Sequence, residues 1–137
     1  MKNLIKLIAI ALLLFCIKMS AQLDTLNYLK QFEANKAYYI GQPFSKLLSD
    51  MTQIQPKTAW SQPIFKKKSM VQDTSFNFCN KNQTFNNNVI YLDITWQNEI
   101  PYSETKSLSN QNQYYFTNNE KNFYGSKIIK DIKVYRY

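Results

Sequence analysis

The sequence predicts an α+β domain: two short N-terminal helices packed on an antiparallel sheet of about four strands, with a short helical turn before the C-terminal strand. Two observations support this class. Apolar residues recur at helical spacing only before Thr52, whereas Pro56 and Pro63 exclude a long helix in the next segment, and alternating β-branched and aromatic residues follow. Helices that precede the strands, rather than alternating with them, indicate α+β.

The first 21 residues resemble an export signal that is cleaved between Ala21 and Gln22. Lys2 and Lys6 precede an apolar run at residues 7–17, which Lys18 ends well short of the roughly twenty residues that span a bilayer. We therefore expect a periplasmic or secreted protein with no transmembrane helix in the mature chain. Two alternatives stay open: an uncleaved anchor, and a lipoprotein signal acylated at Cys16, which the bulky Phe15 disfavours.

Cleavage would leave residues 22–137 as a single domain of ordinary size. It would also remove three lysines and no acid, which lowers the formal net charge from +8 to +5, a moderate basic excess. Cys79 would be the only remaining cysteine, either a small buried side chain, which we favour, or an intermolecular bridge. The chain has no histidine, so no histidine-based catalytic couple or zinc site is expected.

Each helix of the N-terminal part has its own signal. Asp24 can cap a first helix, in which Leu26, Leu29 and Phe32 recur every three residues until residue 35. After Gly41, Pro43 suits the first position of a second helix, because its fixed φ and missing N–H are harmless there. The second helix has an apolar stripe at i, i+3, i+4 and i+7, formed by Phe44, Leu47, Leu48 and Met51.

The sheet is expected to begin with two strands at residues 64–71 and 75–80, joined by a hairpin turn at residues 72–74. The three lysines at 66–68 would make the first of them an edge strand. After a polar loop at 80–88 comes the clearest strand, with one apolar face toward the core, formed by Ile90, Leu92, Ile94 and Trp96.

The last forty residues are harder to assign. The apolar residues of 103–113 follow neither the helical nor the strand period, so this segment fits a helix or a long loop. The structure of residues 99–116 is therefore left open. Thr117 or Asn118 can cap a short helical turn, which Gly125 would end in a left-handed conformation. A terminal strand follows at 127–137. Its apolar residues occur at both odd-numbered and even-numbered positions, so both of its faces are expected to be partly covered.

The sequence contains several patterns that occur in enzymes, but none of them identifies a catalytic residue. The S-x-x-K sequence from Ser103 to Lys106 is expected by chance in a chain so rich in both residues. Asp93 and Asp131 are the acids most able to approach one another, but surface carboxylates beside lysines are ordinary. The glycine count excludes a phosphate-binding loop, so we expect no nucleotide and no cofactor, and we predict no metal ligands.

One group of residues has the chemistry of a binding surface. Lysines and aromatic side chains together attract and stack on single-stranded nucleic acid or sugars, although lysine runs more often only solvate an edge. The candidate residues are Trp60, Lys66, Lys67, Lys68, Tyr91 and Asp93.

Three passages resemble a group of small exported bacterial proteins of unknown function. They are the helix entry at residues 39–48, YIGQPFSKLL, the strand LDITW at 92–96, and the closing NFY at 122–124 with IIKDIKV at 128–134. The resemblance covers most of the mature domain, and its motifs are structural, so it implies no activity.

These observations favour a non-enzymatic exported domain that binds a protein or glycan partner at the cell envelope or outside the cell. One alternative is a hydrolase without histidine that acts on cell-wall or polysaccharide substrates through carboxylates. The other is a secreted inhibitor or immunity-type protein. The sequence leaves the oligomeric state open.

Overall fold

The computed structural model describes residues 1–8 and 23–137. The predicted cleavage site after Ala21 and most of the apolar run at 7–17 lie outside these residues. Residues 2–8 are helical, and no helix within the described residues is long and apolar enough to cross a membrane.

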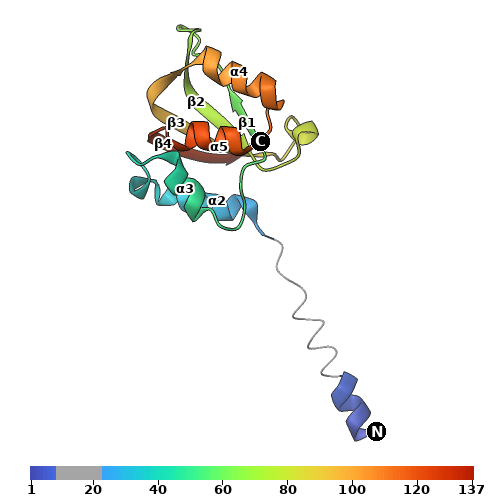
Figure 1. Ribbon diagram of the computed structural model, residues 1–137. Coiled ribbons are helices and arrows are strands. Elements are labelled where there is room, and N and C mark those ends of the chain that lie inside the picture. The colour runs from blue at the N-terminus through green and yellow to red at the C-terminus, as the bar shows by residue number, and fades with distance from the viewer. Residues whose placement is uncertain (9–22) are drawn as a thin grey trace.

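Four strands form one antiparallel sheet in the order β1-β2-β3-β4 (Figure 1). This confirms the predicted α+β class. The strands are β1 (Thr58–Ser61), β2 (Met70–Asn77), β3 (Ile90–Pro101) and β4 (Ile129–Arg136). The helices of the domain are α2 (Thr25–Ala34), α3 (Phe44–Asp50), α4 (Tyr102–Asn112) and α5 (Asn118–Gly125), with short 3-10 turns η1 (Lys36–Tyr38) and η2 (Lys81–Gln83).

The core lies against one face of the sheet, which we call the inner face. Phe44 of α3 stacks on Phe76 of β2 with ring centroids 4.7 Å apart, and Tyr124 of α5 stacks on Trp96 of β3 at 5.7 Å. All four rings are at most 1% exposed. The Trp96 Nε1–H donates to Thr74 Oγ1 at 2.9 Å, so this buried polar group is partnered.

The N-terminal helices follow the sequence prediction closely. The Asp24 carboxylate accepts the backbone N–H of Asn27 and caps α2, and the stripe of α3 from Phe44 to Met51 is buried. Pro43 lies one position earlier than predicted, as the extended residue before α3 rather than the first helical residue.

The predicted hairpin at residues 72–74 is wrong. β2 continues through these residues, because their backbone pairs with β3 after a register shift between Val71 and Asp73. The strand β1, which the sequence analysis missed, precedes the true connection at residues 62–69. The lysines at 66–68 therefore lie in a tight turn, in which the N–H of Lys67 bonds to the carbonyl of Ile64, and not on an edge strand.

The segment left open, at residues 103–113, is the helix α4, and α5 begins with a capping box between Thr117 and Glu120. Gly125 does not have the left-handed conformation predicted for it. It is instead the last helical residue of α5, and a Cβ placed on it would lie 3.5 Å from Cβ of Ser45 in α3. This is an ordinary van der Waals distance, so the packing of α5 on α3 has room for a methyl group at this position.

A register shift explains why the apolar residues of the terminal strand occur at both odd-numbered and even-numbered positions. Thr95 pairs with Asp131, but the next residue, Trp96, pairs with Ile129, so β4 has one extra residue at this point. The bulge brings Ile129 to the same inner face as Ile132 and Val134, and all three are at most 1% exposed.

Candidate functional site

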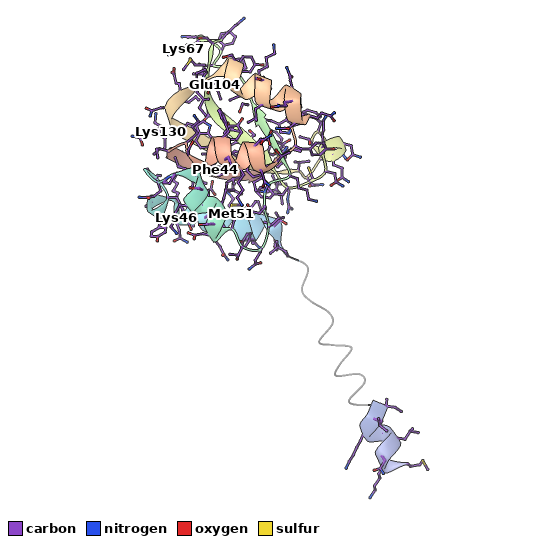
Figure 2. The ribbon with its side chains drawn as sticks, in the orientation of Figure 1. Phe44, Lys46, Met51, Lys67, Glu104 and Lys130 are labelled. Carbon is purple, nitrogen blue, oxygen red and sulfur yellow. The ribbon has the colours of Figure 1, made fainter. Side chains whose placement is uncertain are left out.

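The structure divides the six predicted site residues into two groups. Trp60 on β1 and Tyr91 and Asp93 on β3 project from the same side of the sheet, which we call the outer face, opposite the core. The lysines at 66–68 lie at the tip of the β1–β2 connection, at one extreme of the molecule, where Figure 2 labels Lys67. The predicted basic aromatic platform is therefore not a single surface.

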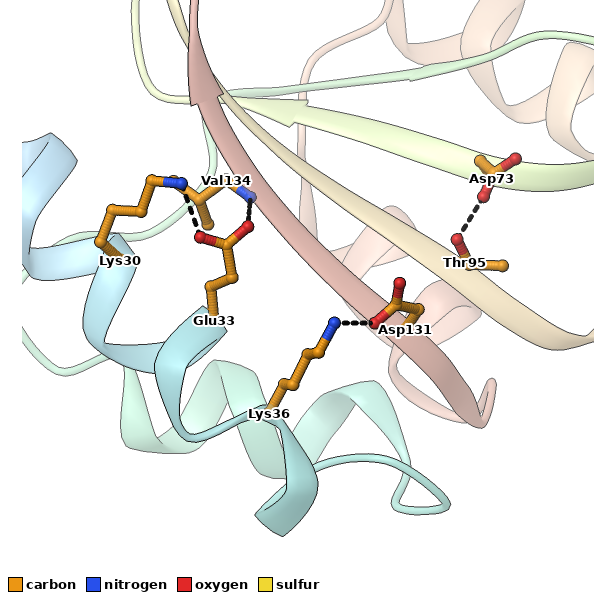
Figure 3. A network of polar contacts seen from close by, with 7 residues as sticks. All are labelled: Lys30, Glu33, Lys36, Asp73, Thr95, Asp131 and Val134. Carbon is orange, nitrogen blue, oxygen red and sulfur yellow. Dashed lines mark hydrogen bonds and ion pairs between the residues drawn. The ribbon is translucent and has the colours of Figure 1, made fainter.

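The centre of the outer face is a grid of carboxylates and hydroxyls from β2 and β3. Ser75 Oγ donates to Asp93 Oδ1 at 2.6 Å. Figure 3 shows the second contact, in which Thr95 Oγ1 donates to Asp73 Oδ1 at 2.5 Å. The register places Asp73 opposite Thr95 and Ser75 opposite Asp93. Asp73 is exposed and the other three are half-buried, so this part of the sheet is open to solvent.

The Trp60 side chain lies on the β1 side of this grid of carboxylates and hydroxyls, in a fixed orientation. Its ring stacks on Tyr114 with centroids 4.1 Å apart and planes 12° from parallel, and Phe85 meets it edge-on at 5.6 Å. Its Nε1–H donates to Thr58 Oγ1 at 3.0 Å. Because the ring is half-buried and held on several sides, it offers a preorganised aromatic surface.

A groove of about 510 Å³ runs from Trp60 over the start of β2. Its walls combine one aromatic ring with carboxylates, amides and a hydroxyl, supplied by Trp60, Gln62, Gln72, Asp73, Ser75 and Glu99. Lys67 pairs with Glu99, which ties the tip of the β1–β2 connection to the far end of β3. Gln72 donates to the backbone carbonyl of Trp96 at 2.8 Å, across the irregular part of the β2–β3 ladder.

The β4 side of the outer face carries three tyrosines, which we call the tyrosine ridge: Tyr91, Tyr135 and Tyr137. The Tyr91 and Tyr135 rings are parallel, with centroids 5.2 Å apart, and Tyr137 lies edge-on to both. Burial and the adjacent Asp93 carboxylate raise the pKa of Tyr135, and burial raises the pKa of Tyr91. Both phenols therefore stay protonated at neutral pH and offer hydroxyl groups rather than charge.

The two ends of the outer face are bounded by connections. At one end Tyr91 donates its hydroxyl to the carbonyl of Thr84 at 2.9 Å, and Thr58 and Asn77 are fully buried. Residues 80–88 thus close that end, and the turn at 64–70 with the Lys67–Glu99 pair bounds the other. Between these ends the face is open.

Both edges of the sheet are occupied by other parts of the chain. Beside β1, the N–H of Ala59 bonds to Tyr114 and the N–H of Phe116 bonds to Lys57. Beside β4, Gly41 and Gln42 exchange backbone hydrogen bonds with Ile129. The sheet therefore presents its outer face, and not a free edge, for contact with another molecule.

Further along β4, the Glu33 carboxylate of α2 accepts the backbone N–H of Val134 at 2.9 Å and pairs with Lys30 at 2.6 Å (Figure 3). Partial burial opposes ionisation of Glu33, but these two hydrogen bonds outweigh it and lower its pKa. Asp131, which the sequence analysis paired with Asp93, instead bonds to Lys36 at 2.7 Å. Asp93 lies opposite Lys133.

The remaining candidates stay apart from the outer face. Ser103 and Lys106 are exposed on α4, where the Lys106 amine lies over the Tyr102 ring. Cys79 is half-buried, so it is more accessible than the fully buried thiol that we favoured. Within residues 1–8 and 23–137, no group of three or more Cys, Asp and Glu side chains is arranged to hold a metal ion.

The sequence analysis missed Asp73, Ser75, Glu99 and Tyr135. Asp73 and Ser75 were assigned to or beside a turn, although their alternation with Thr74 and Phe76 already had the period of a strand. No family model matches the chain, and no curated protein or solved structure matches it either.

Proposed function

We propose that the chain is an exported, non-enzymatic domain that binds a glycan on the outer face of its sheet. The observation that supports this most is the groove beside Trp60, in which a fixed aromatic ring adjoins carboxylate, amide and hydroxyl groups. Export is proposed from the composition of residues 1–21.

The side chains of the groove suit the chemistry of a sugar ring. A pyranose has an apolar C–H face that packs on an aromatic ring, and hydroxyls around its rim that both donate and accept hydrogen bonds. Asp73 and Asp93 each use Oδ1 to accept from a neighbouring hydroxyl, and an ionised carboxylate has further lone pairs that can accept from a ligand. Gln62 and Gln72 add amides near the same ring.

The distribution of charge favours a neutral or amino-bearing glycan over a polyanion. Asp73 and Glu99 line the groove, where Lys67 pairs with Glu99, whereas Lys66 and Lys68 are exposed at the tip of the turn. A polyanion such as nucleic acid would place its charges beside Asp73 and Asp93, which repel them. This is the reason to prefer a sugar to the nucleic acid that a lysine run suggests.

The hydrolase alternative requires two carboxylates on either side of a glycosidic bond. Asp73 and Asp93 lie side by side as diagonal neighbours on one open face, an arrangement suited to contacting one side of a ligand. The inhibitor alternative would place a protein on the same face. We favour the glycan because the groove places hydrogen-bonding side chains beside a fixed aromatic ring.

The test uses the full chain and a panel of neutral, amino-bearing and anionic oligosaccharides from bacterial envelopes and plant walls. Binding would be followed by tryptophan fluorescence, because Trp60 is half-buried whereas Trp96 is fully buried. We expect a change with neutral or amino-bearing members, and loss of binding by at least tenfold in Trp60→Ala.

The matched control is Tyr38→Ala, an aromatic that is 63% exposed and packs beside α3, away from the outer face. It should bind as the unaltered protein does. A panel without any binding, or equal losses in both variants, would contradict the proposal; release of reducing ends during incubation would support the hydrolase.

A further inference from the structure

We infer that the glycan is a polymer bound along its length, in a path that crosses the four strands, rather than a single sugar or a chain end. This inference rests on the proposed function and specifies its ligand. It comes from the order of side chains across the outer face, where aromatic rings at the β1 side and at the β3–β4 side flank hydrogen-bonding groups.

Two rows of paired residues cross the sheet from β1 to β4. The row that is open to solvent along its whole length consists of Trp60, Ser75, Asp93 and Lys133. In the adjacent row Thr58 and Asn77 are fully buried, so only Tyr91 and Tyr135 of that row are accessible. In the first row an aromatic ring is followed by a hydroxyl and a carboxylate that are bonded to each other. At its β4 end the Lys133 amine lies over the Tyr135 ring, 5.4 Å from its centroid.

Aromatic surfaces therefore occur at both sides of the sheet, with hydrogen-bonding groups between them. Trp60 lies on the β1 side and the tyrosine ridge on the β3–β4 side, and the carboxylate and hydroxyl grid separates them. A chain of linked sugars presents the matching order, because each ring has an apolar face and each is separated from the next by polar groups.

The dimensions also require more than one sugar. Adjacent strands lie about 4.8 Å apart, so the path from β1 to β4 is about 14 Å long. One pyranose ring covers only a part of this length, whereas a short run of linked rings covers all of it.

The two boundaries of the face set the direction of the path. Residues 80–88 close one end of the strands, and the turn at 64–70, held by the Lys67–Glu99 pair, bounds the other. A linear ligand that lies between them must run across the strands. In this proposal the path leaves the sheet over β1 and β4, and a polymer bound along its length continues beyond both.

The experiment measures how affinity depends on chain length. The full chain is titrated with cello-, chito- and xylo-oligosaccharides of one to six units, by calorimetry and tryptophan fluorescence. In at least one series we expect affinity to rise tenfold or more between one and four units and then to level off. Reduction of the sugar at the chain end should leave the affinity of the six-unit member unchanged.

Two variants locate the ends of the path. Trp60→Ala should weaken binding of every length, whereas Tyr135→Ala should weaken only the longer members, by at least fivefold. Tyr135 packs against Tyr91, so Tyr137→Ala, which alters a side chain that is 79% exposed, provides a second variant if Tyr135→Ala unfolds. Circular dichroism establishes that each variant is folded, and Tyr38→Ala is again the control.

The outcomes separate this inference from the proposed function. Binding that needs Trp60 but does not depend on length, or that reduction of the chain end abolishes, overturns the inference and leaves the glycan-binding function in place. Binding that is unaffected by Trp60→Ala overturns both. If none of the three series binds, the inference is wrong, and the wider panel alone decides the proposed function.

Discussion

Replacing Glu33 should reveal how firmly α2 is fixed to the edge of the sheet. In the native protein its carboxylate accepts the backbone N–H of Val134 at 2.9 Å and pairs with Lys30. Glu33→Gln has a similar helix propensity and keeps a neutral acceptor, whereas Glu33→Ala removes the acceptor altogether.

The structure gives the expected magnitudes. A hydrogen bond to a charged group contributes about 1.5–3 kcal/mol and a neutral one about 0.5–1.5 kcal/mol, so Glu33→Gln should lower the free energy of unfolding by about 1 kcal/mol. Glu33→Ala should cost about 2 kcal/mol, because it leaves the Val134 N–H without its acceptor. Lys30 is 46% exposed, so Lys30→Ala should cost at most about 0.5 kcal/mol and is the control.

The pH dependence gives a second check. Because the pKa of Glu33 is lowered in the folded protein, its contribution is fully present above the unfolded value of about 4.3 and is lost as the pH falls through the folded value. The stability difference between the native protein and Glu33→Gln should thus be largest at neutral pH and shrink at about pH 3.

Urea denaturation of the native protein and the three variants at both pH values measures these differences, with equal slopes taken as the sign that only stability has changed. Equal stability of the native protein and Glu33→Ala at neutral pH would refute the role assigned to the Glu33–Val134 contact. A Glu33→Gln difference of the same size at both pH values would refute the electrostatic part.

Three further predictions concern stability and use thermal or urea denaturation. Gly125→Ala should stabilise the protein by about 0.5–1 kcal/mol, because the new Cβ meets Ser45 at an ordinary 3.5 Å contact in a helical conformation; destabilisation would show that α3 and α5 cannot accept it. Trp96→Phe should cost about 2 kcal/mol through lost packing and the lost bond to Thr74, and an unchanged stability would contradict the buried position of the ring. Thr117→Ala should cost about 1 kcal/mol by removing the cap of α5, whereas Asn110→Ala, on the exposed side of α4, should have little effect.

Strong local periodicity made some elements predictable. The stripe of α3 and the alternation from Ile90 to Trp96 each leave one buried face, and the sequence analysis identified both correctly. The cap at Asp24 was equally clear, because its short side chain precedes an amphipathic run.

The β1–β2 connection was misplaced for a physical reason. The segment at 72–74 contains no residue that requires a turn, and it forms a strand by pairing with β3, which is distant in sequence. The four residues of β1 are too few to show a period. Long-range pairing of this kind decides both elements, and a single sequence does not display it.

The candidate site was predicted in part for the same reason. Trp60, Tyr91 and Asp93 have suitable chemistry, and the register of the sheet brings them to one face. The lysines at 66–68 were grouped with them because of a strand that does not exist. Tyr135 was missed because it joins this face by pairing with Tyr91, which is distant in sequence.

The occupied edges of the sheet have a consequence for how this protein can change during evolution. Because backbone groups at parts of both edges are bonded within the chain and the strands pair with one another, recognition on the outer face depends on its side chains. Residues such as Asp73 are exposed there and contribute little to the core, so their replacement should cost less than about 0.5 kcal/mol. The same scaffold can therefore acquire new ligand preferences by surface substitutions while its folding remains unaltered.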